Sequence, residues 1–174
     1  MLFDFKQRLF FFFIAMFFFL GLFQLGFSIK IDKSFSEELS KNFIEQIQGI
    51  NETGIFLNNL KIALAMFIPI IGIVIGSFSA FSTGLIFNSI TNLSNVQYPN
   101  PLIVFLTPFG ILELMSYGIA LSRGGIFLYE ISKRRISKKS IVYLLVEIGL
   151  VISMLFIGAL IEWNMIGNIP KKPI

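Results

Sequence analysis

Four ionisable side chains lie inside long apolar stretches of the chain, and they are its most unusual chemistry: Glu113, Arg123, Glu147 and Glu162. On insertion scales an ionisable residue in a bilayer costs about 2.5–3.5 kcal/mol, so each needs a purpose or a partner. Arg123 and one of these glutamates could form a buried pair. Two interpretations stay open, a charge relay or gating site and a structural polar clamp between helices.

The residue types that most catalysts and metal sites need are missing. The 174 residues include no Cys and no His, and the only aspartates are Asp4 and Asp32. Without them there is no thiolate, no disulfide, no imidazole base and no zinc or copper site built on His. We therefore expect no metal, no cofactor and no enzymatic activity.

The composition is that of a membrane protein. Hydrophobic residues make up 55% of the chain and charged residues only 14%, whereas a soluble domain carries about 25% charged residues. The net charge of +4 could suggest nucleic acid, but most of the basic residues lie at the edges of apolar blocks, as membrane proteins place them. The expected fold is all-α, a multi-pass helix bundle in the cell membrane with the lipid bilayer as a partner and no nucleic acid.

Four apolar blocks divide the chain. They cover about Leu9–Ile29, Leu60–Leu93, Leu102–Tyr129 and Ile141–Trp163. We predict an anchor helix in residues 1–29, a polar loop in 30–59, a membrane helical core in 60–163 and a short disordered tail in 164–174. The basic start before the first block also resembles a signal peptide, but the block is long enough to span a bilayer and no cleavage site of the A-x-A kind follows it.

The polar loop contains one amphipathic pattern. Its apolar residues recur at spacings of three and four, at Phe35, Leu39, Phe43, Ile47 and Ile50. Polar residues fall on the opposite face, at Glu38, Lys41, Glu45 and Gln48. This pattern predicts a helix, with Ser34 and Glu37 as a capping box and Gly49 as the stop. The helix either lies against the membrane or a partner, or it caps the protein's own bundle. Its acidic residues argue against anionic lipid headgroups.

The second block is too long for a simple span, because as one helix it would measure about 50 Å against a hydrocarbon core of about 30 Å. Small residues from Gly76 to Gly84 predict either a break or a close helix contact. Gly72 and Gly76 form a GxxxG pair, which permits a homodimer or ordinary packing within the chain.

Two topologies follow from the basic residues. Four spans with the N-terminus outside would place Lys6 and Arg8 across the membrane from the cluster at 133–139. Folding the second block as a hairpin gives five spans, with the N-terminus and the cluster both inside and the amphipathic helix outside. We predict five spans, because they also explain the length of the second block.

The third block is interrupted at Pro108-Phe109-Gly110, which breaks the helical hydrogen-bond ladder. Irregular backbone at membrane depth is tolerated only where protein or water covers it, and such breaks form binding sites in transporters, although a plain proline kink is more frequent. On a helix, Gly110, Glu113, Tyr117, Ala120 and Gly124 share a small, polar face, which another helix or a cavity should cover. We expect Glu113 to clamp the third block against the second, by bonding to a polar group such as Asn88 or Ser82, or to bond to the freed backbone amides near Pro108.

These residues resemble the stage II sporulation protein M family of membrane proteins. The family signature is P-H-G-x-x-E-[LI] at the start of a membrane helix, with small residues and a Gly about ten residues on. The matching residues are Pro108, Phe109, Gly110, Glu113, Leu114 and Gly124, with Asn58, Asn59 and Glu162 in neighbouring motifs. Phe109 replaces the signature His, which removes any role that needs an imidazole there. The resemblance covers about Asn58–Trp163.

The resemblance implies a five-span fold and a scaffolding role, since the namesake looks like a scaffold that holds peptidoglycan-degrading partners at the septal membrane of spore-forming bacteria. We expect a non-enzymatic scaffold or accessory subunit of a larger membrane complex, with other membrane proteins as partners. The alternative is a small permease-like or channel-like protein with a polar site at the Pro108–Glu113 break.

Overall fold

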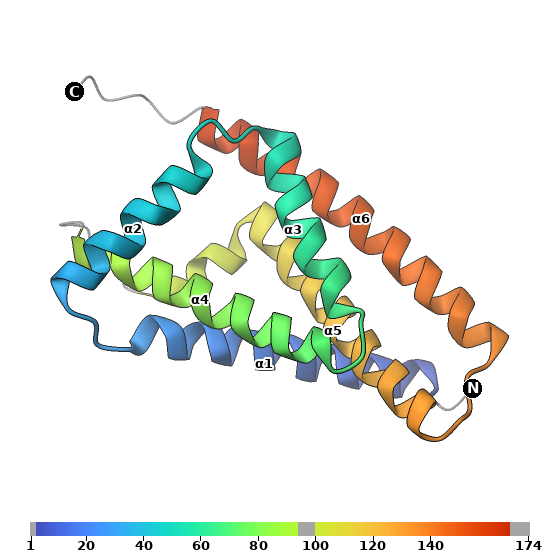
Figure 1. Ribbon diagram of the computed structural model, residues 1–174. Helices are drawn as coiled ribbons and strands as arrows, with labels where there is room; N and C mark the ends of the chain where they lie inside the picture. Colours follow the sequence, from blue (N-terminus) through green and yellow to red (C-terminus); the bar gives the residue numbers. More distant parts are fainter. Residues whose placement is uncertain (1–2, 94–99, 168–174) are drawn as a thin grey trace.

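The computed structural model describes residues 3–93 and 100–167, and within these ranges every regular element is helical. Six α-helices and one 3₁₀ helix follow one another along the chain (Figure 1). They are α1 (Phe5–Ser28), α2 (Lys33–Ile47), α3 (Glu52–Met66), α4 (Ile71–Leu93), η1 (Pro101–Leu106), α5 (Pro108–Ser132) and α6 (Lys138–Gly167). The all-α prediction is confirmed. Most of the predicted C-terminal tail lies outside the described residues.

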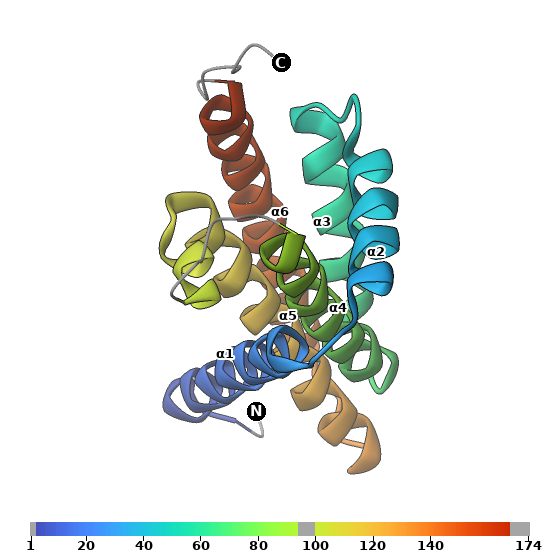
Figure 2. The same cartoon turned by 90° about the vertical axis from the view of Figure 1, so that its left-hand side faces the viewer.

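Four of the helices, α1, α4, α5 and α6, are long and apolar enough to cross a membrane. The hairpin that the five-span topology predicts forms between α3 and α4, but α3 begins eight residues before the second block, inside the predicted polar loop. However, α3 has 15 residues and rises only about 22 Å, so it is shorter than a full span. It still returns the chain through the bundle, beside α5 and α6 (Figures 1 and 2).

The turn of this hairpin lies at Phe67–Ile70, before the small residues rather than among them. Ile70 adopts a positive φ of 68°, which is costly for a β-branched residue. Gly72 lies two residues further on, and a Cβ there would lie 2.1 Å from the Met66 carbonyl oxygen. The turn is therefore tight because residue 72 has no side chain.

The small residues of α4 serve close helix packing. The α1–α4 pair is the most extensive helix contact in the bundle, and a glycine on each helix allows it. A Cβ on Gly84 would lie 2.0 Å from the Phe23 carbonyl oxygen, and one on Gly26 would lie 2.1 Å from that of Phe81. Of the two predicted alternatives for this stretch, the close contact is observed and the break is not.

Gly72 and Gly76 are both buried within the chain. Gly72 packs against the end of α3, and a Cβ on Gly76 would lie 2.5 Å from the Leu121 side chain of α5. The GxxxG face is thus used for packing inside one molecule, so this fold does not leave it open for a homodimer.

The predicted amphipathic helix is α2, and its apolar face turns toward α4. Ser36 and Ser40 are buried at the contact and Leu39 and Phe43 are half-buried beside them. Gly49, at φ 78°, follows the C-cap residue and ends the helix as predicted.

The predicted capping box at Ser34 is wrong. The cap is Asp32, whose carboxylate accepts hydrogen bonds from the Phe35 amide at 2.8 Å and the Ser34 hydroxyl at 2.9 Å. Both bonds lower the pKa of Asp32 below its ordinary value, and the bond from the Phe35 amide has the larger effect.

Candidate functional site

Two polar clusters lie inside the bundle, one toward each end of α5 and α6. The first, the carboxylate cluster, consists of Asn59, Glu113, Tyr117 and Glu162. The Asn59 amide of α3 donates a hydrogen bond to the Glu113 carboxylate of α5. Tyr117 is buried one turn further along α5, and Glu162 of α6 is close enough to interact electrostatically with both. Three helices thus meet at one polar point.

The start of α5 positions this cluster. Thr107 is the N-cap, and its hydroxyl accepts a hydrogen bond from the Gly110 amide at 3.1 Å. Pro108 occupies the first helical position, where its missing amide hydrogen costs nothing. A Cβ on Gly110 would lie 2.1 Å from the Val104 carbonyl oxygen, so η1 packs directly on this turn. The predicted interruption is therefore a helix start and not a kink inside a span.

The Glu113 contact joins α5 to α3, through the last residue of the predicted polar loop and not through the second apolar block. Asn88 and Ser82 are the partners that the sequence suggested. Instead Asn88 donates to the Ile29 carbonyl, and Ser82 donates to Ser79 at 3.2 Å within its own helix. The observed partner is Asn59, which belongs to the family-like Asn pair.

The other family-like residues divide between the interior and the surface. Gly124 packs against α3, where a Cβ would lie 2.5 Å from the Met66 carbonyl oxygen, and Leu114 is buried. Phe109 is half-buried, while Asn58 and Pro108 are exposed. The face predicted to be covered is covered, since Gly110, Tyr117, Ala120 and Gly124 are all buried.

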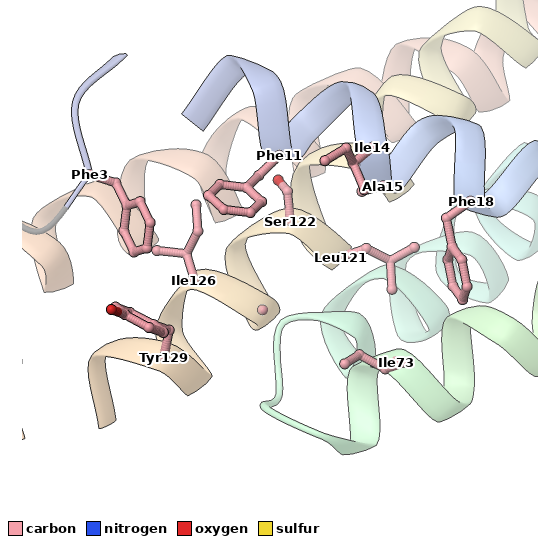
Figure 3. Close-up of a pocket in the computed structure, with 11 residues that line it drawn as sticks. Phe3, Phe11, Ile14, Ala15, Phe18, Ile73, Leu121, Ser122, Ile126 and Tyr129 are labelled. Atoms are coloured by element: carbon pink, nitrogen blue, oxygen red, sulfur yellow. The ribbon is translucent and has the colours of Figure 1, made fainter. Parts of the chain in front are cut away.

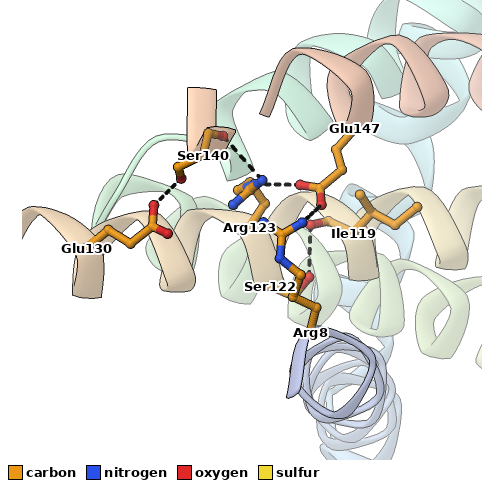
Figure 4. A network of polar contacts seen from close by, with 7 residues as sticks. All are labelled: Arg8, Ile119, Ser122, Arg123, Glu130, Ser140 and Glu147. Atoms are coloured by element: carbon orange, nitrogen blue, oxygen red, sulfur yellow. Dashed lines mark hydrogen bonds and ion pairs between the residues drawn. The ribbon is translucent and has the colours of Figure 1, made fainter. Parts of the chain in front are cut away.

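The second cluster, the arginine cluster, is centred on Glu147 of α6. Its carboxylate accepts from Arg123 of α5 at 2.5 Å and from Arg8 of α1 at 3.2 Å (Figure 4). The Arg123 side chain is 1% exposed and that of Arg8 is 13% exposed. The predicted buried pair of Arg123 with a glutamate is confirmed.

Glu130 and Ser140 extend the arginine cluster. The Ser140 hydroxyl donates to the Glu130 carboxylate, and the Arg123 guanidinium reaches the Ser140 carbonyl at 3.5 Å. Glu130 is 2% exposed and Ser140 is fully buried. Two arginines and two glutamates therefore balance in charge. The Arg8 guanidinium also stacks over the Tyr143 ring, 4.3 Å from its centroid.

Sequence reasoning missed Arg8, Glu130 and Ser140. Arg8 is one of the basic residues that flank the first apolar block, and Glu130 lies in the last turn of α5, directly after the third apolar block and close to the basic loop. A usable signal did exist, because a lone acid at the end of an apolar block calls for a partner as Glu113 does.

The Arg8–Glu147 bond agrees with the five-span arrangement and not with the four-span one, although only four of the described helices are long and apolar enough to cross a membrane. Glu147 lies in the half of α6 that follows the basic loop at 133–137, so the start of α1 lies at the same end of the bundle as this loop. The four-span arrangement would place these segments on opposite sides. We call this end of the bundle the loop side.

In chemical terms both clusters are suited to holding helices together. The described part of the chain contains no group of three His, Cys, Asp or Glu residues arranged to hold a metal ion. The sequence profile of the stage II sporulation protein M family matches residues 9–164, nearly the whole of the described bundle. The chain belongs to this family.

Family membership extends further than the motifs around α5 indicated. The match takes in α1 and α2 as well as the stretch from Asn58 to Trp163. Together with the four long apolar helices it establishes a multi-pass membrane protein. No match was found among curated proteins or solved structures.

Proposed function

We propose that this stage II sporulation protein M family member is a non-enzymatic scaffold or accessory subunit of a larger membrane complex. The observation that carries the proposal is a pair of exposed apolar residues on α2, Ile44 and Ile47, which we call the outer rim of α2. Ile44 and Ile47, one helical turn apart, are 57% and 40% exposed, and α2 is not among the helices that could span a membrane. Apolar side chains on the spans can face lipid, whereas these two belong to an acid-containing helix in the polar segment.

A protein partner fits this rim better than lipid does. The opposite face of α2 carries Glu38 and Glu45, and interfacial helices that bind anionic headgroups carry Lys and Arg instead. The middle of the apolar face is already occupied by α4. A partner helix could therefore pack alongside α2 and cover the two isoleucines without displacing it.

The experiment is purification in mild detergent with quantification of co-purifying membrane proteins. The test variant is Ile44→Ser with Ile47→Ser. Burying an isoleucine contributes about 1.5–3 kcal/mol, so losing two partly buried ones should weaken a partner at least about tenfold. Ile136→Ser is the matched control, since Ile136 is 48% exposed on the loop side. Retention of every partner by the double variant would contradict the proposal, as would equal loss in the control.

Leu39 and Phe43 are unsuitable for this test. Both are half-buried against the protein's own bundle, so replacing them would detach α2 itself and would not report on a partner.

The carboxylate cluster favours a second candidate, a permease-like protein in which Glu113 carries charge. Glu113→Gln separates the two functions. If Glu113 is a clamp, the amide still accepts from Asn59 and stability changes little, while Glu113→Leu costs about 1–3 kcal/mol because Asn59 loses its acceptor. If the charge itself is needed, Glu113→Gln abolishes transport in proteoliposomes and leaves thermal stability intact.

A further inference from the structure

A large apolar groove runs between α1 and α5 on the loop side of the bundle (Figure 3). Its volume is about 590 Å³, within the range of about 300–1,000 Å³ typical of ligand clefts. Phe11 and Phe18 of α1 form one wall, Leu121 and Ile126 of α5 form the other, and Ile73 of α4 borders the inner end. The shape and lining suit a single hydrocarbon chain.

Gly125 keeps the groove open. A Cβ on Gly110, Gly118 or Gly124 of the same helix would lie within 2.6 Å of a neighbouring atom, so these glycines serve close packing. Gly125 lines the groove, and a Cβ there would meet nothing within 4 Å. No helix contact requires a glycine at residue 125, and any larger side chain there would occupy groove volume.

One end of the groove, at Phe3 and Tyr129, lies beside a basic side chain. Phe3 and Tyr129 pack edge to face there, with ring centroids 5.3 Å apart, and Figure 3 shows both rings at the end of the groove away from Ile73. The Lys133 ammonium lies 5.7 Å from the centroid of the Tyr129 ring. Lys133 also begins the basic cluster that continues to Lys139. A positive charge thus lies beside the Tyr129 end of the apolar groove.

We propose that this groove binds an anionic phospholipid from the leaflet on the loop side. One acyl chain lies between α1 and α5, and the phosphate lies beside Lys133 and the Tyr129 hydroxyl. The charge selects the occupant, because a juxtamembrane Lys or Arg attracts anionic lipid by about 1 kcal/mol, which corresponds to about fivefold in affinity. A transmembrane helix of another protein would gain nothing from Lys133.

The test is native mass spectrometry of the delipidated protein, titrated with phosphatidylglycerol or phosphatidylcholine of identical chains. The expected result for the parent is one tightly held phosphatidylglycerol, preferred about fivefold or more over phosphatidylcholine. Gly125→Leu should lose binding of both lipids, because its side chain fills the groove. Lys133→Gln should keep the acyl site and lose the preference for the anionic headgroup.

Gly149→Leu is the matched control, since a Cβ on Gly149 also meets nothing within 4 Å and this residue faces outward from α6. It should bind lipid as the parent does. Thermal stability of each variant in detergent verifies folding, and Lys133→Gln, a surface change, keeps the test decisive if Gly125→Leu fails to fold. Equal binding of both lipids by the parent, or unchanged preference in Lys133→Gln, would overturn the proposal. Retention of the lipid by folded Gly125→Leu would also overturn it.

Discussion

Removing the Glu147 carboxylate should destabilise the bundle more than any exposed charge change. Glu147 accepts from Arg123 at 2.5 Å and from Arg8 at 3.2 Å. In Glu147→Leu both guanidinium groups lose their carboxylate, and Arg123 is only 1% exposed. Breaking a buried ion pair from one side costs about 3–5 kcal/mol. The Glu147 side chain keeps 24% exposure, so we expect the lower end, about 3 kcal/mol.

The assay is thermal unfolding in a mild detergent. For a protein of this size about 1 kcal/mol corresponds to about 2–4 °C in Tm, so Glu147→Leu should lower Tm by about 6–12 °C. The control is the exposed pair Lys41–Glu45, at 3.9 Å with side chains 76% and 61% exposed. Glu45→Leu removes a pair worth less than about 1 kcal/mol and should shift Tm by less than about 4 °C.

A second variant tests the cause of the loss. Arg123→Met with Glu147→Met removes both charges, and replacing a buried pair by apolar residues is often neutral. Arg8 lies near the start of α1, so its head can reach water. The double variant should therefore be more stable than Glu147→Leu. If Glu147→Leu unfolds at the parent temperature, or if the double variant is the less stable one, the cluster is not a charge-balanced clamp.

Three further predictions concern topology, packing and pH. Ser34→Cys, at an exposed position in the first turn of α2, should react with an impermeant maleimide from the side opposite to Ser132→Cys near the basic loop, and labelling of both from one side would refute the hairpin topology. Gly84→Leu should destabilise by at least about 1–3 kcal/mol in thermal unfolding, because its Cβ meets backbone at 2.0 Å, whereas Gly21→Leu, which meets nothing within 4 Å, should not. Hydrogen bonds lower the pKa of Asp32, so its carboxylate should cap α2 fully above the ordinary aspartate pKa. The cap should be lost as the pH falls through the lowered pKa of the folded protein. Amide exchange in the first turn of α2 should rise in this pH range in the parent and not in Asp32→Asn.

The helix order could be predicted from the sequence because lipid leaves few alternatives for the backbone. Apolar length favoured a hairpin at the second block, and one is observed, although its first helix, α3, begins eight residues before the block. The position of its turn could not be predicted in the same way. Small residues in an apolar helix permit either a break or a close contact, and only the path of α1 past Gly84 decides for contact. The actual turn uses Ile70 at positive φ, which no sequence rule favours.

The sequence predicts that the buried charged residues form hydrogen bonds, but it does not identify the residues that form them. The cost of burying Glu113 and Arg123 requires hydrogen-bonded partners, and both have them. Which residue supplies the partner depends on how each helix is rotated about its own axis. Asn59 faces Glu113 because α3 packs against both α5 and α6, and by its chemistry alone Asn88 would have been an equally good partner.

Arg8 links the stability of the bundle to its direction of insertion. A basic residue before an apolar block favours the inner side of a membrane whatever it contacts. Here the same residue bonds to Glu147, beside the buried Arg123 and near the basic loop. If α1 crossed the membrane in the other direction, Arg8 would lie at the far end of the bundle and Glu147 would face Arg123 alone. The Arg8 guanidinium therefore both flanks the first apolar block and completes the arginine cluster, so the arrangement with the N-terminus and the basic loop at one end of the bundle is also the one in which the buried charges balance.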